Sequence, residues 1–206
     1  KKKEDDFVYC LSHLYKYSDY ITINISSPNT EGLRNFHEKN LMDQLLEKLS
    51  QLKKKKNINK PIVIKLSPDI NEKELSMIIE LIFKYKIDGI IISNTSDTNR
   101  EKLVDNKKSE EGGLSGLPIK DLSTQMIKKF YKEVKKKIPI IGVGGVDSGP
   151  SAFEKIIAGA TAVQLYTGMV YKGPGIVKEI KKDLISTLKK EKIKKIGDAV
   201  GINAWP

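Results

Sequence analysis

The chain has 206 residues, with 37 lysines and arginines against 26 aspartates and glutamates, and its formal net charge is +11. Its single cysteine excludes a disulfide framework, and no apolar run is long enough to cross a bilayer. Only Arg34 and Arg100 are arginines, whereas nucleic-acid-binding proteins favour arginine interleaved with aromatic residues. We therefore interpret the lysines as solvated helix faces and expect no nucleic-acid partner, although a basic surface favours anionic membranes or substrates.

Strand-like and helix-like patterns alternate along the chain. Short apolar runs predict strands at residues 20–26, 61–66, 89–94, 138–142 and 162–167. Apolar residues with a helical period predict helices around residues 41–52, 75–83, 122–134 and 176–188, with a shorter helix at 151–158. Asn71, followed three residues later by Glu74, matches a capping box at the start of the second helix.

This alternation predicts an α/β fold with parallel strands and right-handed crossovers. The candidates are an open doubly wound sheet and a (β/α)8 TIM barrel. The first strand lacks a following Gly-x-Gly-x-x-Gly turn, which disfavours a nucleotide-binding open sheet. Polar residues repeatedly stand at the carboxyl ends of strands, where barrel enzymes build their active sites. We therefore favour a barrel, although the predicted strands are fewer than the eight of a closed one.

The first strand leads into a polar loop. Apolar and polar residues alternate over residues 21–26, and Pro28 must end the strand because it cannot continue a central ladder. Polar side chains with donors and acceptors then cluster at the strand end: Asn24, Ser27, Asn29 and Thr30. This cluster suits a planar polar ligand, and the alternative is an ordinary turn built by Ser, Pro and Asn for local reasons.

The second and third strands also end in polar residues. Ile64 and Leu66 share one face of the second strand, and Lys65 lies on the other face. In a barrel, the face that carries Lys65 would point to the interior. A lysine there is costly unless something anionic meets it, and the alternative is a lysine at a surface edge. The buried third strand ends at residues 93–95, Ser-Asn-Thr, which is either a binding site or an ordinary strand terminus.

Two glycine-rich loops could admit a ligand. Residues 112–118, GGLSGLP, precede a helix, and glycines allow close backbone approach to an anion. Residues 141–149, IGVGGVDSG, occupy the penultimate βα loop, and barrels often bind phosphate between their last two loops. Asp147 would oppose phosphate unless its side chain points away. No metal site is expected, because His13 and His37 lack partners at ligand spacing.

The pattern Asn-x-Ser-Ser-Pro-Asn-Thr-x-Gly-Leu-Arg, from Asn24 to Arg34, resembles the active-site strand and loop of dihydroorotate dehydrogenases. Serine at position 27 is similar to the membrane-linked, quinone-using class, since the soluble class has cysteine there. The resemblance covers nearly all of this chain but only about the second half of a full enzyme. It implies that residues 1–206 supply about the last five βα units of an FMN-binding catalytic barrel.

The resemblance also implies roles for individual residues. Ser27 is the catalytic base, and Thr30 helps with an ordered water, because a free serine is a poor base. The substrate ring and its carboxylate are held by Asn24, Asn29, Asn94 and Thr95. FMN is bound by Asn24, Lys65, Ser93, Gly116, Gly145, Tyr166 and Thr167. In this set Lys65 lies against the flavin ring, where a cation stabilises the reduced flavin, and the last four residues surround the phosphate.

The implied reaction oxidises dihydroorotate to orotate in pyrimidine synthesis, with FMN accepting the hydride and a ubiquinone-type acceptor reoxidising it. Such an enzyme sits on the mitochondrial inner membrane or a bacterial cytoplasmic membrane, attached through a segment absent from this chain. Another segment or a separate chain would supply the first barrel strands. The alternatives are a flavin-free barrel enzyme acting on a phosphorylated substrate and a non-catalytic half-barrel that binds a partner chain.

Overall fold

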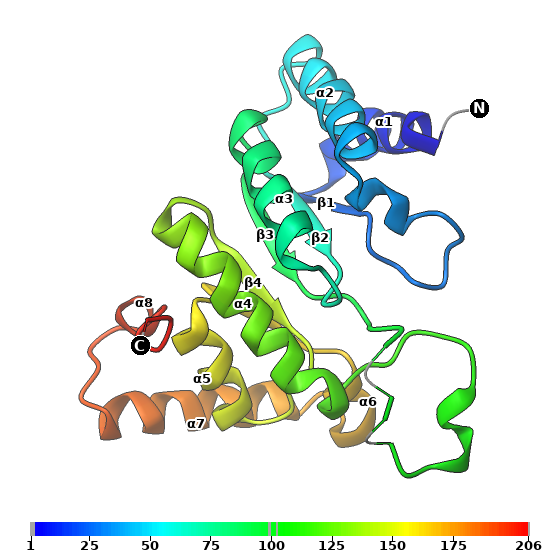
Figure 1. Cartoon of the computed structure of the whole chain (residues 1–206). Helices are drawn as coiled ribbons and strands as arrows, with labels where there is room; N and C mark the ends of the chain where they lie inside the picture. The colour runs from blue at the N-terminus through cyan, green and yellow to red at the C-terminus, as the bar shows by residue number, and fades with distance from the viewer. Residues whose placement is uncertain (1–2, 99, 102, 206) are drawn as a thin grey trace.

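The computed structural model describes residues 3–98, 100–101 and 103–205 (Figure 1). Its centre is a parallel sheet, with hydrogen-bonded neighbours in chain order. The strands are β1 (Ile21–Asn24), β2 (Ile62–Leu66), β3 (Gly89–Ile92), β4 (Ile140–Val143) and β5 (Ala162–Gln164). All five predicted strands are thus confirmed.

Helices connect and follow the strands. The α-helices are α1 (Lys3–Leu14), α2 (Lys39–Lys55), α3 (Glu72–Lys84), α4 (Lys120–Val134), α5 (Gly149–Ala158), α6 (Thr167–Lys172), α7 (Ile176–Lys190) and α8 (Ile196–Ala199). Short 3₁₀ helices are η1 (Tyr15–Tyr17), η2 (Arg34–His37), η3 (Asn106–Ser109), η4 (Leu117–Ile119) and η5 (Lys135–Lys137). Across the described ranges, no helix has both the length and the apolar character that a membrane span requires.

The predicted capping box is confirmed. The Asn71 side chain accepts a hydrogen bond from the Glu74 backbone N–H at 3.0 Å, and the Glu74 carboxylate accepts one from the Asn71 N–H at 2.9 Å. Both bonds satisfy N–H groups that α3 cannot pair internally. The predicted ends of β1, β3 and β5 were two or three residues too late, and Thr167 begins α6 instead of ending a strand.

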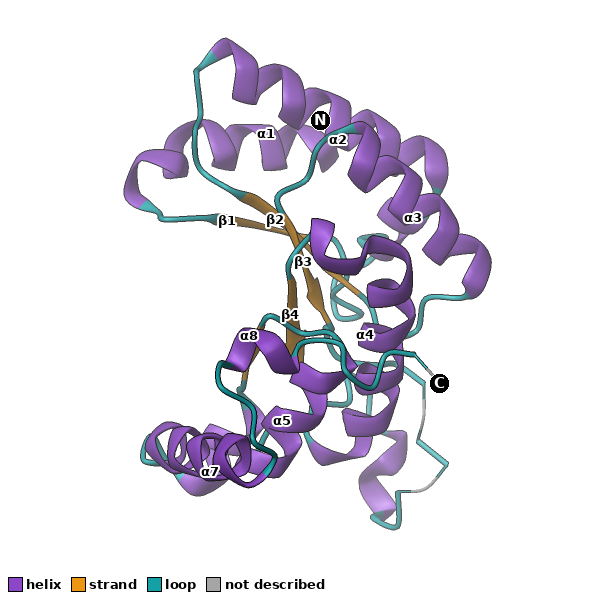
Figure 2. Ribbon diagram, turned by 90° about the vertical axis from the view of Figure 1, so that its left-hand side faces the viewer, coloured by secondary structure: helices purple, strands orange, loops and turns teal. Residues whose placement is uncertain are grey.

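The topology distinguishes the two folds predicted from the sequence. In a doubly wound sheet the strand order reverses at a switch point, whereas here it follows the chain from β1 to β5. Consecutive helices pack on one another, α1 on α2, α2 on α3, α3 on α4 and α4 on α5. Figure 2 shows these helices wrapped around one face of the curved sheet, with the other face open. This is the arrangement of part of a (β/α)8 barrel.

The core lies between the sheet and the helices. Ile64, Leu66, Ile90 and Ile92 point to the helix side and are essentially inaccessible, and they pack with buried residues of α2, α3 and α4. Because side chains alternate along a strand, the residues between them face the opposite, concave side. The large apolar face therefore fixes which polar residues can reach the concave side.

Lys155 is a fully buried cation in this helical layer. Its ammonium group donates to the Lys120 carbonyl and the Thr124 hydroxyl, each at 2.7 Å, which joins α5 to α4. Burial lowers the pKa of Lys155 to about 8. The unfolded chain therefore binds more protons than the native state between about pH 8 and the ordinary lysine pKa, and this group makes stability rise with pH there.

We expect Lys155→Met to abolish that rise. In the wild type, the free energy of unfolding should gain up to about 3 kcal/mol from this group between pH 8 and 10.5, at about 1.4 kcal/mol per pH unit. Urea unfolding at several pH values measures it, and the difference between the two proteins cancels the other lysines. Exposed Lys136→Met serves as the control. An identical pH slope in wild type and Lys155→Met would contradict this expectation.

Candidate active site

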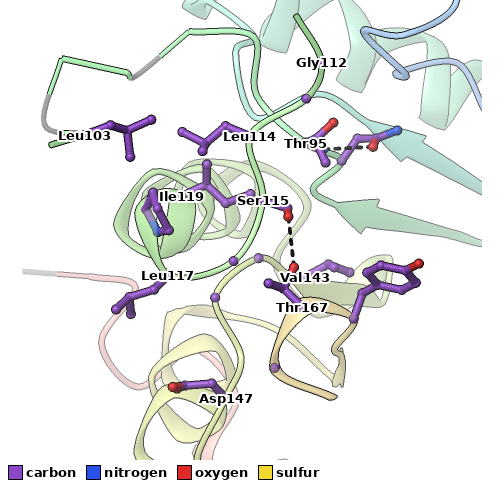
Figure 3. Close-up of a pocket in the computed structure, with 18 of the residues that line it drawn as sticks. Thr95, Leu103, Gly112, Leu114, Ser115, Leu117, Ile119, Val143, Asp147 and Thr167 are labelled. Carbon is purple, nitrogen blue, oxygen red and sulfur yellow. Dashed lines mark hydrogen bonds between the residues drawn. The ribbon is translucent and has the colours of Figure 1, made fainter. Parts of the chain in front are cut away.

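A cavity of about 970 Å³ opens at the carboxyl edge of the sheet, bordered by the ends of β2, β3 and β4 and by the loops that follow β3, β4 and β5 (Figure 3). Apolar side chains including Leu114, Leu117 and Ile119 form part of its lining. Many of the residues singled out from the sequence also line it: Lys65, Ser93, Asn94, Thr95, Gly116, Gly145, Tyr166 and Thr167. The structure therefore brings together groups that are up to about a hundred residues apart.

Asn24 joins this site through a side-chain network. The Asn94 amide nitrogen donates to the Asn24 side-chain oxygen and to the Ser26 hydroxyl, each at 3.0 Å. The Asn94 oxygen accepts from the Thr95 backbone N–H at 2.8 Å. Both N–H groups of the Asn94 amide are thus used within the protein, whereas the Asn24 amide nitrogen has no hydrogen-bond partner among the described residues. That nitrogen is free to donate to a ligand.

Lys65 lies beside Asn24 on the concave face, since the two residues are register partners across β2 and β1. Its side chain is half-buried, and burial lowers its pKa. Within the part of the chain that the structure describes, its ammonium group makes no hydrogen bond or ion pair. A partly desolvated cation without a counter-ion favours an anionic or electron-rich ligand in the cavity.

Ser93 presents a buried hydroxyl to the same cavity. The residue is 2% exposed, and its oxygen has no hydrogen-bond partner in the described structure. Its backbone N–H donates to the Val143 carbonyl at 3.0 Å, and the Ile92–Ser93 peptide bond is cis. Buried hydroxyls are normally paired, so this one fits a site completed by a polar ligand.

The glycine loops meet at the far end of the cavity. Gly116 and Gly145 have φ values of +76° and +70°, which favour glycine. A Cβ on Gly116 would lie 2.8 Å from the Thr167 methyl carbon, and one on Gly145 would lie 2.8 Å from the Lys120 Cα. The Thr167 hydroxyl donates to Ser115 at 2.9 Å (Figure 3). Both glycines are thus needed for close packing of the loops, and Tyr166 beside them is 80% exposed.

Asp147, next to this loop, is engaged by the protein. Its carboxylate pairs with Lys172 at 3.2 Å and accepts from the Ser148 and Ser151 hydroxyls, each at 3.1 Å. Burial works to raise the pKa of Asp147, but these hydrogen bonds and the Lys172 charge outweigh it and lower the pKa. The negative charge is therefore largely compensated, which weakens its opposition to an anion.

The loop after β1 lies outside the lining of the cavity. Ser27, Asn29 and Thr30 are not among the residues that line the cavity. The Ser27 hydroxyl accepts from the Asn29 N–H at 3.3 Å, and the Asn29 and Thr30 side chains are exposed. A Cβ on Gly113 would lie 3.0 Å from Pro28 and would also collide with Thr95, so this loop approaches the cavity wall. The roles of these three residues stay predictions.

Sequence reasoning gave no role to Arg34 and did not predict its ion pairs with two aspartates. The Arg34 guanidinium lies 3.1 Å from Asp69 and 2.6 Å from Asp97, which follow different strands. One signal was present: arginine is rare in a chain that uses lysine for nearly all its positive charge.

The histidines lie outside the cavity. His37 is buried, and burial lowers its pKa to about 4, so it packs as a neutral side chain. His13 is exposed and bonds to its own helix. In the described segments, His, Cys, Asp and Glu form no group of three that could hold a metal ion.

Comparisons with known proteins agree with this geometry. A family model described as dihydroorotate dehydrogenase matches residues 1–188. The chain is 44% identical over 180 residues to the dihydroorotate dehydrogenase (quinone) of Idiomarina loihiensis, covering 85% of this chain and 54% of that protein. The Vibrio atlanticus protein of the same name is 44% identical over 190 residues, covering 89% and 56%.

The fold comparison points the same way. The crystal structure of ligand-free DHODH from Eimeria tenella superposes with a TM-score of 0.93 at 30% identity, covering all of this chain and 61% of that one. A ferulenol complex of the Eimeria tenella protein gives 0.94, with 59% of it covered. This chain spans about half the length of the curated relatives it matches. With most of its length matched by the family model, the chain belongs to the dihydroorotate dehydrogenase family.

Proposed function

We propose that this chain forms part of the FMN-binding catalytic barrel of an enzyme that oxidises dihydroorotate to orotate in pyrimidine synthesis and passes the electrons to a quinone. The observation that carries the proposal is the cavity itself. Lys65 and the buried Ser93 hydroxyl, both without a polar partner among the described residues, line one end of it, and a glycine-lined recess closes the other. The Asn24 side chain lies outside this lining and is bonded to Asn94, which belongs to it. The relatives' shared name, dihydroorotate dehydrogenase (quinone), supports the same reaction and acceptor.

The residues present fit FMN. The unpaired Ser93 hydroxyl and the Asn24 amide nitrogen offer hydrogen bonds to a polar ring edge, and Lys65 offers a cation. The wall formed with Leu114 and Leu117 suits the apolar part of a flat ring system. Gly116, Gly145, Tyr166 and Thr167 would surround the phosphate. Bound FMN would supply the two-electron acceptor that none of the side chains provides.

The protein groups would then act on the substrate. Asn24, Asn29, Asn94 and Thr95 would orient the pyrimidine ring and its carboxylate. The Ser27 hydroxyl would remove a proton from one ring carbon while the hydride leaves the neighbouring carbon. Thr30, exposed in the same loop, would relay the proton onward through water. Asn94 would also act indirectly, because its amide nitrogen holds the Asn24 oxygen in place.

Further structure would complete the barrel. All four residues of β3 are buried, whereas none of β5 is, and Tyr166 and Tyr171 beyond β5 are more than three-quarters exposed. This contrast supports coverage of the β5 edge by the first strands of the barrel, supplied by another segment or by a separate chain. Such a segment would also carry the quinone tunnel and the membrane attachment.

The location proposed is a membrane. The curated relatives compared above are bacterial, which supports the bacterial cytoplasmic membrane. The mitochondrial inner membrane, which the sequence resemblance also implied, has no support in those relatives.

One spectrum tests the proposed function. The full-length protein should be yellow as purified, and its flavin absorption should bleach when dihydroorotate is added without oxygen. A soluble quinone should then restore the colour. A purified protein that binds no FMN would favour the flavin-free barrel enzyme, and a flavin that dihydroorotate leaves oxidised would contradict the substrate assignment.

Thr167→Val tests the phosphate end of the cavity. The change keeps the side-chain shape but removes a hydroxyl that faces the Gly116 loop. We expect the dissociation constant for FMN to rise at least about tenfold, because a hydrogen bond to a charged group contributes about 1.5–3 kcal/mol. Fluorescence titration of the apoprotein measures it. Thr161→Val, at an exposed position, is the matched control, and equal affinity in both variants would count against Thr167.

A further inference from the structure

The guanidinium of Arg34 connects the loops that follow three neighbouring strands. Its Nε donates to the Ser26 carbonyl at 3.3 Å, and one Nη donates to the Thr95 carbonyl at 2.9 Å. The other Nη pairs with Asp69 at 3.1 Å and with Asp97 at 2.6 Å. Ser26 follows β1, Asp69 follows β2, and Thr95 and Asp97 follow β3. The side chain is 21% exposed, so these bonds are partly shielded from water.

Asp69 extends the same network. One carboxylate oxygen accepts from the Ser96 hydroxyl at 2.6 Å and from the Thr98 hydroxyl at 3.0 Å. The other accepts from the Asp97 backbone N–H at 3.3 Å in addition to pairing with Arg34. Its side chain is only 13% exposed. Asp69 therefore holds the β3 loop directly and also orients the guanidinium that holds the β1 loop.

We propose that Arg34, oriented by Asp69, is a positioning residue that sets the relative placement of Ser27 and Thr95 in the active site. This inference rests on the proposed function. The Ser26 carbonyl belongs to the peptide unit that leads directly into Ser27, and the Thr95 carbonyl belongs to a proposed substrate-binding residue. The Arg34 guanidinium is hydrogen-bonded to both carbonyls. The distance between the Ser27 hydroxyl and a substrate ring bound by Thr95 therefore depends on the position of this one group.

Arginine is suited to this position in a way that lysine is not. A guanidinium carries five donors in a rigid plane and can serve carbonyls and carboxylates that lie in different directions. An ammonium group is a point charge with donors on one atom, so it cannot reach all four acceptors together. Losing the connection would let the two loops shift, and a misplacement of about 1 Å can cost about a hundredfold in rate.

The test uses the full-length enzyme with FMN bound. Arg34→Lys keeps the positive charge, and Arg34→Gln removes it. We expect the rate constant of flavin reduction at saturating dihydroorotate to fall at least about tenfold in Arg34→Lys and about a hundredfold in Arg34→Gln. FMN content and the rate of flavin reoxidation by a soluble quinone should change little, because reoxidation does not use the Ser27 hydroxyl.

Two further variants sharpen the test. Lys39→Gln removes an exposed cation paired with Glu80 at 3.1 Å on the helical layer, and it should leave both half-reactions unchanged. Asp69→Asn should slow flavin reduction in the same direction as Arg34→Lys. The effects of Arg34→Lys and Asp69→Asn should not add in the double variant, since the two side chains act as a unit.

The outcomes separate this inference from the function on which it rests. If the wild-type flavin is not reduced by dihydroorotate, the proposed function fails, and the positioning role fails with it. If the wild type is reduced and the Arg34 variants are reduced equally fast, only the positioning role is overturned. Loss of FMN with equal slowing of both half-reactions would make Arg34 a purely structural residue. Should Arg34→Gln fail to fold, Arg34→Lys and Asp69→Asn decide between these results.

Discussion

Ser27→Ala is expected to leave FMN bound in the full-length enzyme but to slow flavin reduction by dihydroorotate at least about a hundredfold. The estimate follows from the usual contribution of a positioned general base, about 10²–10⁴. The hydroxyl is not part of the packed core: its one hydrogen bond in the described structure is the 3.3 Å contact with the Asn29 N–H. Removing the hydroxyl should therefore slow flavin reduction without destabilising the fold. Anaerobic stopped-flow absorbance at saturating dihydroorotate measures the effect.

Two serines serve as comparisons for that experiment. Ser76→Ala on α3 removes an exposed hydroxyl that bonds only to the Glu72 carbonyl of its own helix, so it should change nothing. Ser26→Ala removes a fully buried hydroxyl that bonds to Asn24 and Asn94, so it should disturb substrate binding and stability. Unaltered flavin reduction in Ser27→Ala would show that another group takes the proton.

Lys65→Met is expected to lower the reduction potential of the bound flavin by at least about 30 mV, which equals about 1.4 kcal/mol for a two-electron couple. A nearby cation favours the reduced, negatively charged cofactor, and two charges about 4 Å apart interact by about 4 kcal/mol near a protein surface. Methionine keeps the length of the side chain without its charge. Spectroelectrochemical titration measures the potential independently of turnover.

The control for this experiment is another lysine close to β2. Lys60→Met removes a lysine just before β2, at the opposite end of the sheet, and should leave the potential unchanged. The pH dependence offers a second check. Because burial lowers the pKa of Lys65, the wild type should lose the cation at a lower pH than an exposed lysine would. Its potential should approach that of Lys65→Met as the pH rises, and equal potentials at neutral pH would contradict the assignment.

Element type followed from local sequence, but strand ends did not. The alternating and helical patterns located all five strands and the main helices. When one face of an element is buried, apolar residues recur with the period of that element, and this period can be seen in the sequence alone. The predicted ends of β1 and β3 were two residues too late, because the period of apolar residues does not mark where a strand stops. Ser93 and Asn94 lie beyond β3, although their backbone N–H groups still donate to the Val143 and Leu66 carbonyls.

The reason for the glycine at position 145, in the loop after β4, could not be predicted from the sequence. The sequence predicted that Gly145 is needed because a phosphate approaches it. The structure shows that its conformation and its packing on Lys120 already require glycine, so a larger residue there would disturb the fold before any ligand binds. Thr167→Val is for this reason the better test of the phosphate end. A single sequence cannot separate these two demands on one glycine.

The amino-acid sequence by itself determined the parallel α/β class, the placement of Lys65 on the strand face opposite Ile64 and Leu66, and the motif that identifies the family. Each is either a periodic pattern or a contiguous run of residues, so it needs no knowledge of distant contacts. Only the tertiary structure decided that Arg34 spans three loops and that the Asp147 carboxylate forms an ion pair with Lys172. Arg34 and Thr95 lie 61 residues apart in the chain, and Asp147 and Lys172 lie 25 apart. They meet because parallel strands bring their carboxyl ends to one edge.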